Sequence, residues 1–168
     1  MLNLTYQNAT LADLERLVAV RCQVLRAANL LPEDTPLPEV EQQTRAYYQK
    51  AFAENTHTAY LVWDGDTLAG TGAVSYFQVM PTVHNPTGQK AYLMNLYTAP
   101  QYRRQGIATH TLALLVEDAH RRGITAISLE ATAMGRPLYE RFGFVPMEHE
   151  MELHGFARGP ILEGAGTA

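Results

Sequence analysis

One stretch of the chain, residues 91–98, constrains the fold more than any other. It reads Ala-Tyr-Leu-Met-Asn-Leu-Tyr-Thr and is apolar at both alternating sets of positions, so a strand here would be covered on both faces. Pro100 ends the strand, and apolar residues at helical spacing then run over 105–122, before Gly123. A central strand followed directly by an amphipathic helix predicts a fold of the α/β (α+β) type.

The other segments add strands and helices around this unit. Thr10 and Asp13 resemble a helix cap, and a turn at 64–66 predicts a hairpin. Further helices are predicted at 39–54, at 137–142 and in a segment that ends near residue 29, and further strands at 2–6, 58–63, 68–79, 124–130, 144–146 and 148–153. We expect one domain over 1–154 and an irregular tail over 155–168, with a mixed, twisted sheet of about six or seven strands and four helices.

Composition and charge exclude several classes of function. The 168 residues are 46% hydrophobic and 18% charged, which is typical of a globular domain. A net charge of −4 gives no overall positive field, so nucleic acid is not an expected partner. No window approaches a membrane span, and the N-terminal residues do not resemble a signal peptide. We therefore expect a cytoplasmic protein that has no membrane partner.

The lone cysteine and the histidines do not indicate metal or nucleophilic chemistry. Cys22 lies among apolar residues of a predicted helix, so we expect it in the core. The six histidines are dispersed, and none forms an i, i+4 pair with another. The Gly-x-Ser-x-Gly motif of serine hydrolases does not occur. We expect no metal cofactor.

The loop between the 91–98 strand and the following helix has the features of an anion site. Arg103 and Arg104 supply positive charge, while Gly106 and Ala108 let a phosphate approach the backbone. Unpaired N–H groups and the helix dipole would strengthen the attraction. The loop lacks the Lys-Ser/Thr ending of a Walker loop and the three glycines of a dinucleotide fingerprint, which favours a diphosphate bound without metal. The alternative is a plain helix start with solvated arginines.

This segment resembles the acetyl-CoA loop of the GNAT superfamily of N-acetyltransferases. The family pattern Arg/Gln-x-x-Gly-x-Gly/Ala matches Arg103, Gly106 and Ala108, and residues 91–145 resemble the family from its fourth strand onward. The resemblance implies a sheet splayed between strands four and five, with acetyl-CoA in the gap as acyl donor. It places pantetheine on the backbone of the strand and the diphosphate on the loop, and the implied cofactor-binding residues are Leu96, Tyr97, Thr98, Arg103, Arg104, Gln105, Gly106, Ile107, Ala108 and Thr109.

The reaction implied by the resemblance is direct transfer of acetyl from the thioester to an amine. Tyr139 occupies the family pattern Leu-Tyr-Glu-x-x-Gly-Phe and is the implied proton donor to the departing thiolate. The alternative is a tyrosine that only packs on Phe142 or Phe144.

Two further polar residues are candidates for the acceptor side. Glu130 follows a predicted strand and is the candidate base acting through a water; a surface carboxylate paired with Arg136 or Arg141 is the alternative. Asn95 either lines the acceptor pocket or satisfies buried backbone groups.

The sequence leaves the acceptor open between a small-molecule amine and a peptide amine. Four carboxylates hint at a cationic acceptor, although a solvated loop face is the favoured explanation of the same charges: Glu33, Asp34, Glu39 and Glu41. A non-catalytic acyl-CoA-binding or sensing module is the alternative function. A homodimer paired through 144–153 is one option for the assembly.

Overall fold

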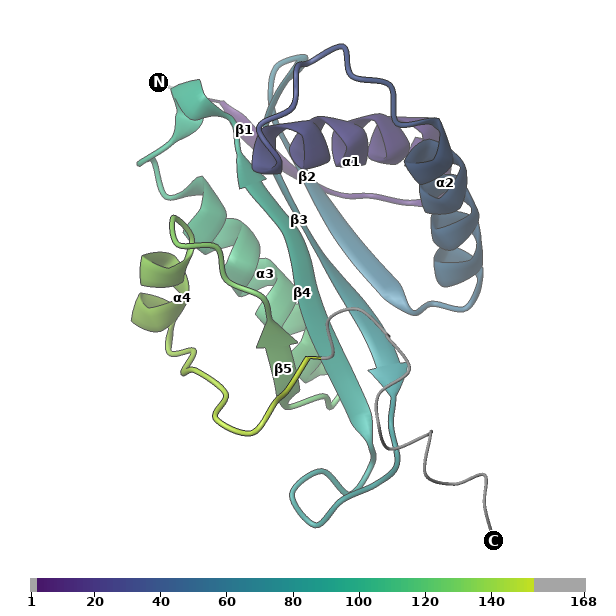
Figure 1. Cartoon of the computed structure of the whole chain (residues 1–168), viewed down its shortest axis with the longest axis vertical. Coiled ribbons are helices and arrows are strands. Elements are labelled where there is room, and N and C mark those ends of the chain that lie inside the picture. The colour runs from purple at the N-terminus through teal and green to yellow at the C-terminus, as the bar shows by residue number, and fades with distance from the viewer. Residues whose placement is uncertain (1–2, 153–168) are drawn as a thin grey trace, which may run out of the picture. The chain divides into compact units, whose positions relative to one another are not determined.

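The computed structural model describes residues 3–152, which form two compact units, one ending at Thr132 and the other starting at Ala133. The first unit is built on a five-stranded sheet whose strands follow the order of the chain. They are β1 (Leu4–Asn8), β2 (His57–Asp64), β3 (Thr67–Gln78), β4 (Gln89–Thr98) and β5 (Ala126–Leu129) (Figure 1). Neighbouring strands are antiparallel except β4 and β5, which are parallel. The strand predicted at 91–98 is thus confirmed as an interior strand.

Helices cover both faces of this sheet. α1 (Leu14–Ala28) and α2 (Pro38–Ala53) lie on one face, and α3 (Ile107–Arg121) lies on the other (Figure 1). The predicted cap is present ahead of α1, where the Thr10 N–H donates to Asp13 at 3.0 Å. A 3-10 turn, Leu11–Asp13, joins this cap to the helix. The fold class predicted from the sequence is confirmed.

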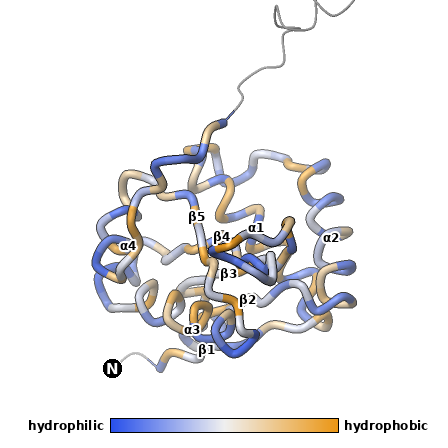
Figure 2. Tube along the Cα trace, turned by 90° about the horizontal axis from the view of Figure 1, so that it is seen from below, coloured by the Kyte–Doolittle hydropathy of each residue, from blue (hydrophilic) through white to orange (hydrophobic). Residues whose placement is uncertain are grey.

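Apolar side chains fill the space on both sides of the sheet. Figure 2 shows hydrophobic residues along the central strands and hydrophilic residues in the surrounding segments. Cys22 is buried on α1, as predicted for a core residue. The fully buried residues include Leu17, Leu61, Val62, Val74, Ile107, Leu112 and Leu115.

The second unit contains α4 (Arg136–Phe142), which ends at Gly143 with φ +115°. The strands predicted at 144–146 and 148–153 are wrong for the described residues, because 144–152 form neither strand nor helix. Every residue from 145 to 152 is exposed, so the alternating pattern buries no apolar face, and Pro146 lacks an N–H for strand pairing. Residue 153 and the expected tail over 155–168 lie outside the described residues. Over the described chain the sheet has five strands instead of six or seven.

The C-terminal half of α3 is attached to the sheet through Asp118. Its carboxylate accepts hydrogen bonds from Tyr76 Oη at 2.6 Å and Thr58 Oγ1 at 2.8 Å. Arg121 and Arg122, at the end of α3, donate to the same carboxylate at 2.8 and 3.0 Å. Burial acts to raise the pKa of Asp118, but the hydrogen bonds from Tyr76, Thr58 and Arg121 outweigh it and hold the pKa below its usual value.

Asp118→Asn is expected to lower the free energy of unfolding by about 2–3 kcal/mol, because an amide cannot accept all four donors. The folded state holds the Asp118 proton less tightly than the unfolded state does. The carboxylate therefore stabilises the fold above about pH 5, and this contribution is lost as the pH falls below about 4. Urea unfolding measured between pH 3 and 7 checks both effects. A variant with the stability and acid sensitivity of the wild type would contradict them.

Candidate functional site

The outer edge of β4 is open along its second half. β5 pairs with β4 only between Lys90 and Leu93, and the last matched residues are Leu93 and Leu129. β4 continues to Thr98, so residues 94–98 have no strand beside them on that side within the described chain. Backbone groups along such an edge are available to an extended ligand that binds as an added strand does.

A β-bulge bends β4 where the two strands part. Between Met94 and Tyr97 it has two residues, Asn95 and Leu96, opposite the single residue Gly72 of β3. Asn95 takes a left-handed conformation with φ +58°, which asparagine tolerates better than most residues. A Cβ on Gly72 would lie 2.9 Å from Leu96 Cδ1, so the glycine leaves room for the Leu96 side chain.

The loop after β4 is fixed to the sheet by three bonds. The Ala99 N–H donates to the Ala69 carbonyl at 2.9 Å, and the Tyr102 hydroxyl donates to Asp64 at 3.2 Å. Arg103 Nε donates to the Thr98 carbonyl at 3.3 Å, across the turn from strand to loop. The start of α3 is thereby held close to the open edge of β4.

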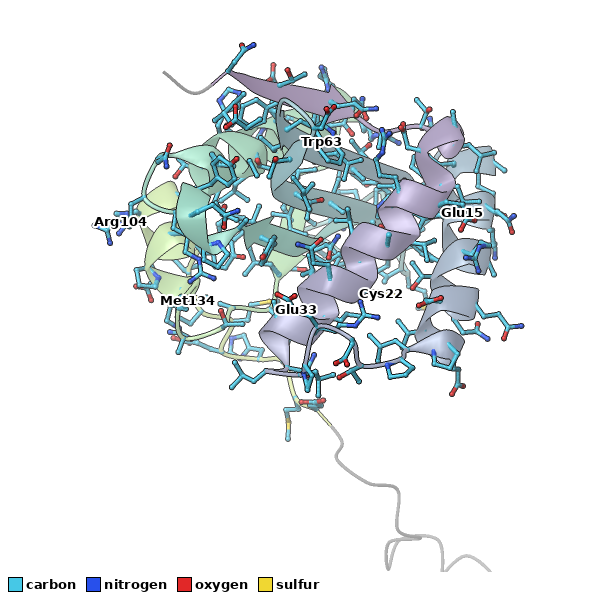
Figure 3. The ribbon with its side chains drawn as sticks, turned by 90° about the horizontal axis from the view of Figure 1, so that it is seen from above. Glu15, Cys22, Glu33, Trp63, Arg104 and Met134 are labelled. Atoms are coloured by element: carbon cyan, nitrogen blue, oxygen red, sulfur yellow. The ribbon has the colours of Figure 1, made fainter. Side chains whose placement is uncertain are left out.

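The N-terminus of α3 presents a row of unpaired backbone donors. Arg104 and Gly106 adopt left-handed conformations, with φ +66° and +80°. Within the described residues, the N–H groups of 104–109 have no hydrogen-bond partner. Arg103 and Arg104 are exposed, and Arg104 projects away from the ribbon (Figure 3). Six free donors, the helix dipole and two guanidinium groups make this loop suited to an anion such as a diphosphate.

A buried hydroxyl lies between the open edge and the loop. Thr98 Oγ1 is inaccessible to water and has no hydrogen-bond partner among the described residues. Most buried hydroxyls are hydrogen-bonded, so an unpartnered one is uncommon; among the described side chains only His57 Nε2 shares this state.

The predicted proton donor and base are found on different elements. Glu130 is exposed and directly follows β5, one residue beyond the point where β5 parts from β4. Arg136, one of its two expected ion-pair partners, bonds to Glu140 at 3.5 Å. Tyr139 lies on α4 in the second unit, with its ring edge against Phe144 at 6.0 Å between centroids. This is the packing expected of the structural alternative, and burial also raises the pKa of the Tyr139 phenol.

The sequence analysis missed one residue of this region, Arg21 of α1. Its Nη1 donates to Asn95 Oδ1 at 3.0 Å, which gives the Asn95 side chain a partner at the bulge. The two residues are 74 positions apart, so no local pattern links them. The combination of Gly72 with an asparagine inside an apolar strand was the only sequence signal for the bulge.

Residues 3–152 contain no group of three or more His, Cys, Asp or Glu side chains placed to bind a metal ion. None of their helices combines the length and apolarity needed to cross a membrane.

Comparison with known proteins places the chain among acetyltransferases. The model of the acetyltransferase (GNAT) family matches residues 24–144. The [ribosomal protein bS18]-alanine N-acetyltransferase of Escherichia coli is 31% identical over 120 residues, which are 67% of this chain and 76% of that protein. The uncharacterized N-acetyltransferase YsnE of Bacillus subtilis is 34% identical over 92 residues, which span only 55% of its own length and 52% of this chain.

Solved structures give the same result. A predicted acetyltransferase from Clostridium acetobutylicum, crystallised with acetyl-CoA, has a TM-score of 0.82 and 30% identity over 90% of this chain and 96% of its own. A GCN5-related N-acetyltransferase from Ralstonia eutropha has a TM-score of 0.74 at 21% identity, over 90% of this chain and 99% of its own. The second likeness concerns the fold alone.

Proposed function

The chain belongs to the GNAT family of acetyltransferases, and from this premise we propose that it transfers acetyl from acetyl-CoA directly to a primary amine of a small molecule or peptide. The observation that carries the proposal is the open edge of β4 leading into six unpaired N–H groups at the start of α3. The Clostridium acetobutylicum relative, whose structure holds acetyl-CoA, supports the choice of acyl donor.

The residues along this path fit the two halves of the cofactor. The extended backbone at Leu96, Tyr97 and Thr98 is suited to the amide groups of pantetheine, and Thr98 Oγ1 lacks a partner that such a group would supply. The loop is suited to the diphosphate, with the N–H groups of Arg104 to Thr109 as donors and Arg103 and Arg104 as charges. The hydroxyl of Thr109 adds one more donor in the first turn of α3.

In the proposed reaction the amine nitrogen bonds to the acetyl carbon, and the carbon–sulfur bond breaks. Glu130 takes the proton lost by the amine, through a water, because an alkyl amine is charged at neutral pH and cannot attack until it is deprotonated. Tyr139 gives its phenolic proton to the leaving thiolate and recovers one from solvent. The phenol is protonated throughout the neutral range, as a proton donor must be, and burial raises its pKa further, which makes it a weaker acid than a free tyrosine.

Peptide amines stay among the proposed acceptors. The Escherichia coli relative is named for acetylating an alanine of ribosomal protein bS18, so that relative uses a protein as acceptor. Asn95 lies at the bulge beside the proposed transfer point and is proposed to contribute to the acceptor site.

The proposal predicts that the purified protein binds acetyl-CoA and, less strongly, free coenzyme A, in calorimetric titrations. It also predicts acetyl-CoA-dependent release of thiol when amines are added. Titration of folded protein without any heat of binding would contradict the cofactor assignment. Binding without thiol release over a broad panel of amines and peptides would instead support a non-catalytic acyl-CoA-binding module.

A further inference from the structure

Arg21 places a guanidinium group beside the β4 bulge. The residue lies on α1 and is half-buried, and its Nη1 donates to Asn95 Oδ1 at 3.0 Å. This bond fixes the guanidinium next to the residue where β4 loses its neighbour β5. A positive charge is thus held at the edge along which the proposed acetyl transfer takes place.

The charge of Arg21 is not neutralised within the described part of the chain. No carboxylate there lies within ion-pair distance of it, whereas Arg16 on the same helix pairs with Asp13 at 3.4 Å. Of the five N–H donors of Arg21, only one bonds to a residue within 3–152, namely Asn95. A half-buried cation with four free donors is suited to bind an anion, since desolvation without a partner is unfavourable.

The shape of the group suits an anion that offers two oxygens side by side. Guanidinium presents paired, coplanar donors that match the oxygens of a carboxylate or a phosphate, and the carboxylate is the anion that amino acids carry next to the amine. We propose that Arg21 is a specificity residue that binds a carboxylate of the acceptor, so that the acceptors are amino acids or similar amines with a carboxylate near the amine. This inference rests on the proposed acetyltransferase function and narrows its substrate class.

The acidic residues near the end of α1 argue for a different acceptor, a cationic one. Glu33, Asp34 and Glu39 are exposed to solvent, and Figure 3 shows Glu33 beside the end of α1. Glu41 on α2 is half-buried. None of the four forms a hydrogen bond or ion pair with Arg21 among the described residues, and the charges of Glu33, Asp34 and Glu39 are those of a solvated surface. Arg21 is the charged group tied to the bulge itself.

The test compares acceptors that differ only in the carboxylate. In the activity assay, thiol release is measured with L-amino acids, their primary amides, the decarboxylated amines and spermidine. In the binding assay, calorimetry measures how N-acetyl-amino acids and their amides bind to the protein loaded with coenzyme A. The wild type is expected to prefer the carboxylate form about ten- to a hundredfold, in kcat/KM and in binding. Arg21→Gln is expected to bring this preference close to one, mainly through KM, and Arg21→Lys to retain part of it.

Arg16→Gln is the matched control, because it removes the same charge from the same helix at a residue that already has a partner. It is expected to keep the carboxylate preference. Equal use of amides, a preference for spermidine, or the same loss of preference in both variants would overturn the inference. If the wild type binds no acetyl-CoA, the proposed function fails; if it binds acetyl-CoA but does not discriminate carboxylate from amide, only the inference about Arg21 fails.

Discussion

Tyr139→Phe is expected to lower the rate of acetyl transfer by about a hundredfold or more, the usual contribution of a general acid. The substitution removes only the hydroxyl, and the phenylalanine ring keeps the edge contact with Phe144. The affinity for acetyl-CoA should therefore stay the same. Steady-state thiol release and calorimetric titration of the two proteins separate the effect on chemistry from the effect on binding.

The pH dependence gives this prediction a second readout. With the phenol absent, water must protonate the leaving thiolate, so the high-pH limb that the phenol imposes on kcat should disappear. Tyr6→Phe serves as the control, because it removes the same atom from β1, the strand at the opposite end of the sheet from β5. Equal rates for Tyr139→Phe and the wild type would remove Tyr139 from the mechanism.

Thr109→Glu is expected to weaken acetyl-CoA binding by about a hundredfold or more while leaving the fold intact. Thr109 is exposed in the first turn of α3, where a carboxylate interacts favourably with the helix dipole, by about 0.3–1 kcal/mol. In the proposed complex the same carboxylate repels the diphosphate. Two like charges about 4 Å apart near a protein surface repel by about 4 kcal/mol before salt screening.

Thr109→Gln is the matched control for this variant, since glutamine has the shape of glutamate without its charge. It should reduce affinity only slightly, through loss of the hydroxyl. Thermal unfolding without ligand should show Thr109→Glu at least as stable as the wild type, and calorimetry at two salt concentrations should show its binding defect shrinking at high salt. Equal affinities for the two variants would mean that the phosphates bind elsewhere.

Much of the fold and of the anion loop could be predicted from the sequence, because short runs of consecutive residues determine both. Residues 91–98 are apolar on both faces, and β4, which contains them, lies between β3 and β5 in the strand order, although only its first half pairs with β5. Gly106 and Ala108 predict a helix start that a phosphate can approach, and at this start the N–H groups of residues 104–109 have no partner within the described chain. Such signals need only a few consecutive residues to be read.

The features that the sequence did not reveal depend on residues far apart in the chain. The bulge at Asn95 lies opposite Gly72 on the neighbouring strand, which leaves space for side chains of both Thr111 and Leu96. The contact between Arg21 and Asn95 joins a helix, α1, to a strand, β4, and the two residues are 74 positions apart in the chain. The strands predicted at 144–146 and 148–153 are wrong over the described residues for a different reason: residues 145–152 are all exposed, whereas a strand needs a neighbour that buries one of its faces.

The chain-order arrangement of the sheet has a consequence for how the protein folds. β2 and β3 are joined by a tight turn and β3 and β4 by residues 79–88, so their pairing closes smaller loops than that of β4 with β5, which are joined through the whole of α3. We therefore expect the hairpins to form first and β5 to dock after α3 has packed. The open edge of β4 thus lies at the border between the early and the late part of the sheet. Because β5 pairs with β4 over only four residues, we expect β5 to separate from β4 while the central hairpins stay folded.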